Sequence, residues 1–236
     1  SDQKEFMVDV GLASYIEKDE MRELVRYARR LGLDVMPEIQ SLSHAYYIAY
    51  AHREVAEIPE ADFPDAYCPR NPESYRILFD VMEEYLEVIE PTRVHIGHDE
   101  WRAAGVCPRC RGKDTGKLFA RDVIRIYQWL QARGIETWMW GDHFVSTHNL
   151  KGRESRTRYV WYCFPDTQSA PDLVARHCPN LKITNWSWSQ GPHADEELAS
   201  RGWEFMYGNF AGARFQDWPR RSAQPACLGG REQPGT

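Results

Sequence analysis

Short apolar runs alternate with longer amphipathic segments along most of this chain, and each pattern predicts a different element. A short apolar run is typical of a buried strand, whereas apolar residues three or four positions apart predict a helix. The predicted strands span residues 6–10, 33–37, 93–97, 136–140, 159–163, 181–186, 204–207 and 226–229. The predicted helices span residues 18–31, 72–89 and 117–132. Strands that alternate with helices favour a parallel sheet, either doubly wound or closed into a barrel.

Each predicted helix carries one apolar stripe, which we expect to face the core. In the first helix this stripe consists of Met21, Leu24, Val25, Ala28 and Leu31. In the second and third helices it consists of Leu78, Val81, Met82, Tyr85 and Leu86, and of Leu118, Val123, Ile126, Tyr127 and Leu130.

Residues with catalytic or binding chemistry follow several predicted strand ends. They are Glu38, His44, Asp99, Glu100, Asp142, Trp186 and Tyr207. No glycine-rich phosphate loop follows an early strand, which argues against a doubly wound nucleotide-binding fold. A site assembled from many strand ends is typical of a (β/α)8 TIM-type barrel. Without an internal repeat or a linker, residues 1–236 are expected to form one α/β domain of this type.

Composition and charge limit the classes of partner. The chain has 29 Lys and Arg against 35 Asp and Glu, a formal charge of -6, and no long basic run. We therefore expect no nucleic-acid partner. No apolar run is long enough for a membrane helix, and the first residues lack a signal-peptide pattern, so we expect a soluble chain without a membrane partner. Whether it is cytoplasmic or exported stays open.

The sequence His95-Ile96-Gly97-His98-Asp99-Glu100-Trp101 carries the most specific chemistry of the chain. Side chains alternate along a strand, so Asp99 and Glu100 share one pocket only if the backbone turns near Gly97. An acidic pair is most often a solvated helix start. Here a buried strand precedes the pair and ionisable or aromatic side chains flank it, a context that indicates a catalytic site.

Three segments resemble glycoside hydrolase family 20, the β-N-acetylhexosaminidases. They are Val35-Met36-Pro37-Glu38-Ile39, Ser43-His44-Ala45 and the His95 to Glu100 segment. The last is similar to the family signature H-x-G-G-D-E, with His98 in place of the second glycine. Trp140-Gly141-Asp142 resembles the end of the family's fifth strand, and Tyr207-x-Asn209 resembles its Tyr-x-Asp on the seventh.

The resemblance implies substrate-assisted hydrolysis of β-linked N-acetylhexosamine through an oxazoline intermediate, without a required cofactor. Glu100 would be the general acid and base, and Asp99 would orient the acetamido group. Tyr207 would donate to the acetamido oxygen, while Trp140 and Trp186 would wall the methyl pocket. Nine Trp and twelve Tyr suit sugar binding, although aromatic residues also fill cores.

The resemblance also places His44, Asp142 and Asn209 among the substrate-binding residues. Other interpretations of these positions stay open. His44 and His95 are equally compatible with pinning strand-end loops, and Asp142 with capping a helix. Trp161 is a rival to Trp186 for the second wall of the pocket.

Departures from the family lead to a further expectation. The family's first two strands carry an Arg and a sugar-binding Asp that match nothing before Lys18, and residues 231–236 replace an expected Glu and Trp. We therefore expect an incomplete barrel, with the family's strands three to eight, a truncated N-terminus and an irregular C-terminus. Its open seam would be covered by another chain, as in a homo-oligomer, or by the weaker strand candidates.

Cysteine spacing adds one candidate metal site. Cys107-Pro-Arg-Cys110 is a C-x-x-C pair, and Cys68 is a plausible third ligand because both segments follow strand ends. A structural zinc ion and free thiols are the two interpretations.

Two other functions remain compatible with the sequence. One is a metal-dependent barrel hydrolase with His44, His95, His98 and Asp99 as ligands. The other is a catalytically impaired sugar-binding fragment. The sequence does not choose between N-acetylglucosamine and N-acetylgalactosamine.

Overall fold

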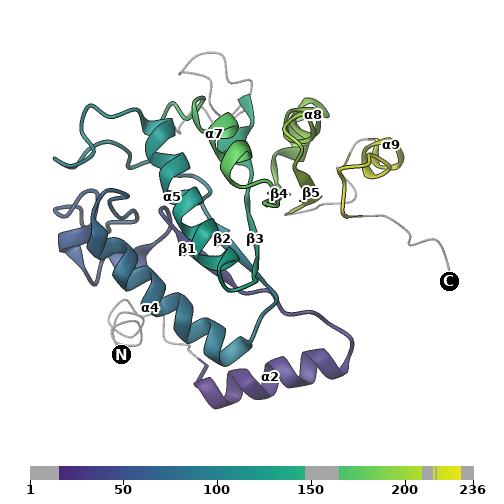
Figure 1. The fold of residues 1–236 in the computed structure, drawn as a ribbon, viewed down its shortest axis with the longest axis horizontal. Coiled ribbons are helices and arrows are strands. Elements are labelled where there is room, and N and C mark those ends of the chain that lie inside the picture. Colours follow the sequence, from purple (N-terminus) through teal and green to yellow (C-terminus); the bar gives the residue numbers. More distant parts are fainter. Residues whose placement is uncertain (1–15, 147–164, 209–214, 216, 230–236) are drawn as a thin grey trace.

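The computed structural model describes residues 16–146, 165–208, 215 and 217–229 (Figure 1). The strands predicted at 6–10 and 159–163, together with Trp161 and Asn209, lie outside the described residues.

Five parallel strands form one sheet in the order β1-β2-β3-β4-β5. They are β1 (Glu38–Ser41), β2 (Arg93–Gly97), β3 (Glu136–Trp140), β4 (Lys182–Asn185) and β5 (Glu204–Tyr207). The predicted bounds of β2, β3 and β5 are confirmed, and β4 is one residue shorter at each end than predicted. The predicted segment 226–229 lies beside β5, where Cys227 forms a parallel bridge with Phe205.

The strand predicted at residues 33–37 is wrong in position, because β1 lies at Glu38–Ser41. Leu33 is 59% exposed. The chain first joins the sheet at Pro37, whose carbonyl accepts a hydrogen bond from the His95 N–H, and the register then shifts between Glu38 and Ser41. An apolar run marked the approach to the sheet, whereas the paired residues of β1 are mostly polar.

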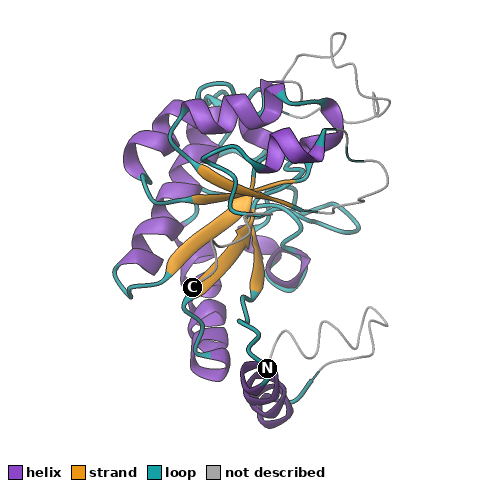
Figure 2. Ribbon diagram, turned by 90° about the vertical axis from the view of Figure 1, so that its right-hand side faces the viewer, coloured by secondary structure: helices purple, strands orange, loops and turns teal. Residues whose placement is uncertain are grey.

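Helices follow the strands and pack along one side of the twisted sheet (Figure 2). The longer ones are α2 (Lys18–Arg30), α4 (Pro72–Ile89), α5 (Thr115–Gln131), α7 (Ala170–His177) and α8 (His193–Ser200). Short elements occupy the connections: α3 (Tyr46–Ala49), α9 (Trp218–Ser222), η1 (Arg53–Val55), η2 (Asp142–Phe144) and η3 (Ser187–Gln190). Side-chain caps start two of the long helices, with Asn71 accepting from the Glu73 N–H and Asp114 from the Lys117 N–H.

The core lies between the sheet and the helices. The strand residues Val94, Ile96, Met139, Ile183 and Phe205 are fully buried. The predicted stripe of α5 is buried throughout, and the stripe of α4 is buried at Leu78 and Met82. In the described part of the chain, no helix combines the length and the apolar character needed to cross a membrane.

The predicted inward stripe of the first helix is wrong in part. Val25 is buried, but Leu24 is 50% and Leu31 is 60% exposed. The helix α2 packs against α4. Among the described residues, this contact covers only one side of the apolar stripe. The 3.6-residue period therefore predicted the helix correctly, but it did not predict which of its apolar residues are buried.

Candidate active site

Left-handed backbone conformations cluster where β1 and β2 end. After β1, Leu42 has a φ of 65° and His44 a φ of 49°. At and after the end of β2, Gly97, His98 and Glu100 have φ values of 70°, 72° and 51°. Non-glycine residues seldom adopt this region, and such strain tends to gather at functional sites. The predicted interruption of β2 at Gly97 is confirmed.

The turn brings both acidic side chains to the same imidazole. His44 Nε2 lies 3.5 Å from Asp99 Oδ2 and 3.5 Å from Glu100 Oε2. All three side chains are partly buried. The hydrogen bond with Glu100 is the largest influence on His44 and raises its pKa. Burial raises the pKa of Asp99, and the His44 charge partly opposes that rise. The two carboxyls therefore occupy one shared environment.

A cation and a hydroxyl also contact this pair. The Arg102 guanidinium lies 2.6 Å from Glu100 Oε2. The Ser43 hydroxyl donates to the backbone carbonyl of Asp99, which joins the loop after β1 to the loop after β2. Arg102 was not predicted as a site residue, although its position two residues after Glu100 indicated that it could lie near the acidic pair.

The turn after β3 holds the backbone that carries the acidic pair. Asp142 Oδ2 accepts the Glu100 N–H at 2.9 Å, and His143 Nε2 accepts the Trp101 N–H at 2.9 Å. Asp142 and His143 are both buried. Burial, followed by the charge of Asp99, raises the pKa of Asp142 to about 8. Asp142 is the first residue of η2 rather than its N-cap, and it acts here on Glu100.

Trp140 is held at the end of β3 by groups from the adjacent strand β2 and from β1, the next strand along the sheet. Its indole N–H donates to Glu38 Oε1 at 2.7 Å, and Gln40 Nε2 donates to the same oxygen at 2.8 Å. Its ring meets the His95 ring edge-on, with centroids 4.8 Å apart. Burial lowers the pKa of His95 to about 3, so this imidazole is neutral. His95 Nδ1 accepts the Gly97 N–H at 3.2 Å, a contact that fits the loop-pinning interpretation.

His98 belongs to a separate buried network. Its Nε2 lies 2.9 Å from Asp122 Oδ2, and its Nδ1 lies 2.9 Å from the Ile96 carbonyl oxygen. The Tyr67 and Tyr75 hydroxyls donate to the same Asp122 carboxylate. Asp122 was not predicted to be part of this network. Its position on the apolar stripe of a predicted helix did indicate a buried carboxylate that needs polar partners.

The four ligands of the rival metal-dependent hydrolase do not converge. His98 is engaged with Asp122, whereas His44 lies beside Asp99 and Glu100. Among the described residues, the group able to share a metal ion consists of Glu57, Cys68, Cys107 and Cys110. The structure thus brings the three predicted cysteine ligands together and adds Glu57, which the sequence did not indicate.

Tyr207 is the last residue of β5 and Trp186 directly follows β4, and neither takes part in the contacts described so far. The Tyr207 hydroxyl donates to Asp195 Oδ2 at 2.9 Å. Asp195 also forms a buried bidentate ion pair with Arg221. The Tyr207 hydroxyl also lies 3.4 Å from the Arg221 carbonyl oxygen. Trp186 is half-buried at the start of η3.

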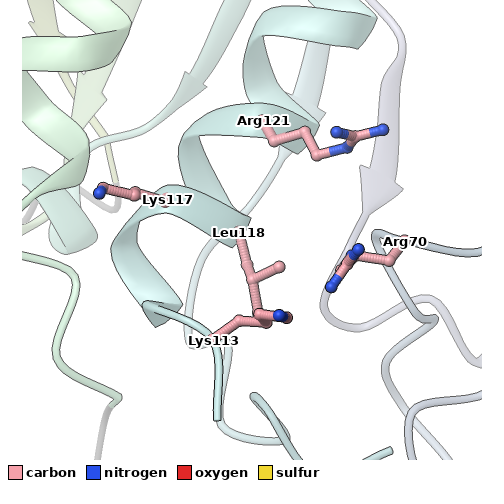
Figure 3. Close-up of a pocket in the computed structure, with 5 residues that line it drawn as sticks. All are labelled: Arg70, Lys113, Lys117, Leu118 and Arg121. Atoms are coloured by element: carbon pink, nitrogen blue, oxygen red, sulfur yellow. The ribbon is translucent and has the colours of Figure 1, made fainter. Parts of the chain in front are cut away.

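A basic depression lies elsewhere on the surface (Figure 3). Its lining consists of Arg70, Lys113, Lys117, Leu118 and Arg121. None of these residues belongs to the group around Asp99 and Glu100, so this depression and the candidate active site are distinct.

The fold and the site define a β/α domain with its chemistry at the carboxyl ends of parallel strands. The family model described as "Glycosyl hydrolase family 20, catalytic domain" matches residues 2–212. The chain belongs to this family.

Individual relatives agree with this assignment. The chain is 31% identical to a beta-hexosaminidase of Akkermansia muciniphila over 159 residues, which cover 61% of the chain and 29% of that protein. It is 28% identical to a beta-hexosaminidase of Porphyromonas gingivalis over 117 residues, which cover 44% of the chain and 15% of that protein. The chain thus spans less than a third of these curated relatives.

A solved structure shows the same fold. The beta-N-acetylhexosaminidase of Bacteroides fragilis aligns with a TM-score of 0.59 at 22% identity. The alignment covers 80% of this chain and 36% of that one.

Proposed function

We propose that this chain is a glycosidase domain that removes β-linked N-acetylhexosamine from glycans with retention of configuration. The observation that carries the proposal is the approach of Asp99 and Glu100 to one His44 nitrogen, each at 3.5 Å. Two carboxyls in a shared environment can divide the work of one reaction. Membership in the glycosyl hydrolase family and the names of the curated relatives support the same substrate class.

In the proposed reaction the substrate supplies its own nucleophile. The 2-acetamido oxygen forms a bond to the anomeric carbon while the bond to the leaving oxygen breaks. Glu100 gives its proton to that oxygen, and the intermediate is an N-protonated oxazoline, an oxazolinium ion whose N–H stays hydrogen-bonded to Asp99. Water then attacks the anomeric carbon and loses a proton to Glu100, while the bond from the anomeric carbon to the acetamido oxygen breaks and the acetamido group is restored. Because the anomeric carbon is attacked twice, the sugar leaves with its original β configuration.

Asp99 would accept a hydrogen bond from the acetamido N–H. That contact orients the acetamido oxygen and stabilises the positive charge that develops as the ring closes. The partial burial of Asp99 strengthens the interaction, because a carboxylate shielded from water acts through a lower dielectric.

The contact between Arg102 and Glu100 has to break during the proposed reaction. The guanidinium favours the ionised form of Glu100, whereas the first step needs the protonated form. We infer that the bound sugar displaces Arg102 from Glu100, which then holds a proton beside the leaving oxygen. In the second step the ionised carboxylate is again the required form.

The described sheet is compatible with strands three to seven of the family's barrel, with the bridged segment at Cys227 as the eighth. In the described residues β1 is one outer strand of the sheet, and the Cys227 segment lies along the outer edge of β5. Coverage of the remaining open seam by a second copy of the chain stays a prediction, which sedimentation velocity tests.

The proposal is tested by turnover of aryl N-acetyl-β-glucosaminides and N-acetyl-β-galactosaminides, with the first-formed anomer identified by NMR. We expect release of the β anomer, and a loss of about 10²–10³-fold in kcat for Asp99→Ala. Asp80→Ala, on the exposed side of α4, is the matched control and keeps the parent rate. Sugar binding without turnover would support the impaired-fragment alternative, and first release of the α anomer would exclude the proposed mechanism.

A further inference from the structure

Four buried donor side chains from the loops after β1 and β2 lie close together. They are Glu57, Cys68, Cys107 and Cys110, and their donor atoms all lie within 4.8 Å of one another. Cys68 Sγ lies 3.4 Å from Cys110 Sγ and 3.4 Å from Cys107 Sγ. The three sulfurs are not bonded to one another.

The first loop, after β1, brings Glu57 and Cys68 together through backbone pairing. Ala56 and Tyr67 form an antiparallel bridge. On its two sides the Glu57 N–H donates to the Ala66 carbonyl and the Cys68 N–H donates to the Val55 carbonyl. This pairing fixes two side chains that lie eleven positions apart in the sequence.

The second loop, after β2, folds the C-x-x-C segment into a tight turn. The Cys107 carbonyl accepts the N–H groups of Cys110 and Arg111. The turn directs both thiols to Cys68, and Arg70 ties the two loops through a hydrogen bond to the Arg109 carbonyl. The site is thus built by the backbone of both loops.

Glu57 is the residue that distinguishes a metal site from a cluster of thiols. One carboxylate oxygen, Oε1, accepts the N–H groups of Val106 and Cys107. The other, Oε2, is buried and has no hydrogen-bond partner in the described part of the chain. No Lys, Arg or His of the described residues forms an ion pair with Glu57, whose side chain is 1% exposed. A metal ion beside Oε2 would give this buried oxygen a partner and balance the charge of the carboxylate.

We propose that Glu57, Cys68, Cys107 and Cys110 bind one structural Zn²⁺ ion. Thiolates with one carboxylate oxygen form a soft donor set that suits zinc, and four protein donors close a tetrahedral site. A Zn–S bond of about 2.3 Å gives a separation of about 3.8 Å between donors of a tetrahedron. The sulfur separations of 3.4 Å and the 4.8 Å limit of the group are compatible with that value after small side-chain adjustments.

The ion would cross-link the two loops that carry the candidate active site. The loop after β1 holds His44, and the loop after β2 holds Asp99 and Glu100. With all four positions occupied by protein, the ion has no open site for water and acts on structure rather than on chemistry. This inference does not depend on the proposed glycosidase reaction.

Metal analysis of the full chain purified without added zinc is the first test. We expect about one Zn²⁺ per chain in the parent and in Cys178→Ser, a buried cysteine outside the group. Cys107→Ser and Cys110→Ser should lose most of the metal. A zinc content near zero in the folded parent would overturn the proposal, and so would unchanged zinc in folded Cys110→Ser, which would mark the metal as adventitious.

Cobalt substitution tests the fourth ligand. The parent loaded with Co²⁺ should show thiolate-to-metal charge-transfer bands and the strong visible bands of tetrahedral cobalt. Glu57→Gln should keep the charge-transfer bands and lose metal to a competing chelator at least about tenfold more readily. Equal retention by the parent and Glu57→Gln would remove Glu57 from the ligand set.

A thiol titration of the folded parent keeps the proposal testable if the serine variants do not fold. Three thiols should become reactive together with release of one zinc ion when a chelator is added. Reaction of these thiols without any metal release, or their recovery as a disulfide in freshly purified protein, would contradict the proposal.

Discussion

The backbone N–H of Glu100 donates to Oδ2 of Asp142 at 2.9 Å, although the two residues lie 42 positions apart in the chain. Asp142 follows β3 and Glu100 follows β2, two adjacent strands of the sheet. The contact fixes the left-handed residue that carries the proposed general acid. Asp142 is buried and holds the Glu100 backbone in place. We therefore propose a positioning role for Asp142 instead of the sugar-binding role expected from the sequence.

The pKa of Asp142 gives the first prediction. Burial raises this pKa from 3.8 to about 8, so the folded state holds one more proton than the unfolded state between these two pH values. Stability is therefore lost as pH rises through this window, on the order of a few kcal/mol from this group. Asp142→Asn keeps an acceptor for the Glu100 N–H and removes the ionisation.

Urea denaturation of the parent and Asp142→Asn at several pH values measures this effect. The curves should agree near pH 4 and separate as the pH approaches 8, with the Asn variant more stable at the upper end. Asp80→Asn, an exposed carboxylate on α4, is the control and should follow the parent. A constant difference in unfolding free energy between the two proteins across this pH range would contradict the raised pKa of Asp142.

The imidazole of His44, which lies beside both Asp99 and Glu100, gives the second prediction. The hydrogen bond with Glu100 is the main cause of the raised pKa of His44, so Glu100→Gln should lower that pKa. Protonated His44 stabilises the fold at low pH, and this stabilisation is lost as the pH rises through the raised value. NMR titration of the His44 ring in the parent and variant measures the change, with His177 on α7 as an internal reference. An unchanged His44 titration would show that the two groups do not interact.

Gly97 gives the third prediction through its backbone angle and its close contact with β1. An added Cβ would lie 2.0 Å from Gln40 Oε1 and 3.0 Å from Gln40 Cα. Gly134 has nearly the same φ, 71° against 70°, with no atom within 4 Å of an added Cβ. Gly134→Ala should cost about 1–2 kcal/mol for the left-handed backbone alone. Gly97→Ala should cost about 1–3 kcal/mol more through steric overlap. Thermal or urea unfolding compares the two variants, and equal losses would rule out the tight contact.

His98 gives the fourth prediction, because it replaces a glycine of the family signature. The left-handed φ of 72° explains why glycine suits this position. In this chain the imidazole contacts the fully buried Asp122, so His98→Gly would remove one of three side chains bound to that carboxylate and leave only the Tyr67 and Tyr75 hydroxyls. We expect a loss of about 1–3 kcal/mol in unfolding free energy, the cost of a lost hydrogen bond to a buried polar group. His98→Gly with Asp122→Asn should recover part of it, and a His98→Gly variant as stable as the parent would refute this account.

The sequence predicted those elements whose pattern is local. The strands β2, β3 and β5 appeared with their bounds because each apolar run is itself the paired segment. The strand β1 was displaced because Glu38 and Gln40 pair in the sheet while the apolar residues before them do not. Exposed Leu24 and Leu31 show the same limit for helices, since periodicity does not reveal which neighbour covers a stripe.

The acidic pair was predicted from the sequence. The residues that hold the surrounding loops in place were not, because their contacts join distant segments of the chain. The turn at Gly97 and the pattern around it indicated Asp99 and Glu100. The engagement of His98 with Asp122, of Tyr207 with Asp195 and of Glu57 with the cysteine loop joins segments far apart in the chain. No local spacing encodes such contacts, so they required the structure.

The leaving-group dependence of Glu100→Gln tests the central claim most directly. A general acid matters most for a poor leaving group and little for an activated aryl group, which departs without a proton. On an unactivated β-linked N-acetylhexosamine disaccharide, Glu100→Gln should lose about 10²–10⁴-fold in kcat/KM. On a dinitrophenyl glycoside the loss should be far smaller. Equal rates of the folded parent and variant on the disaccharide would contradict the assignment of Glu100 as the proton donor.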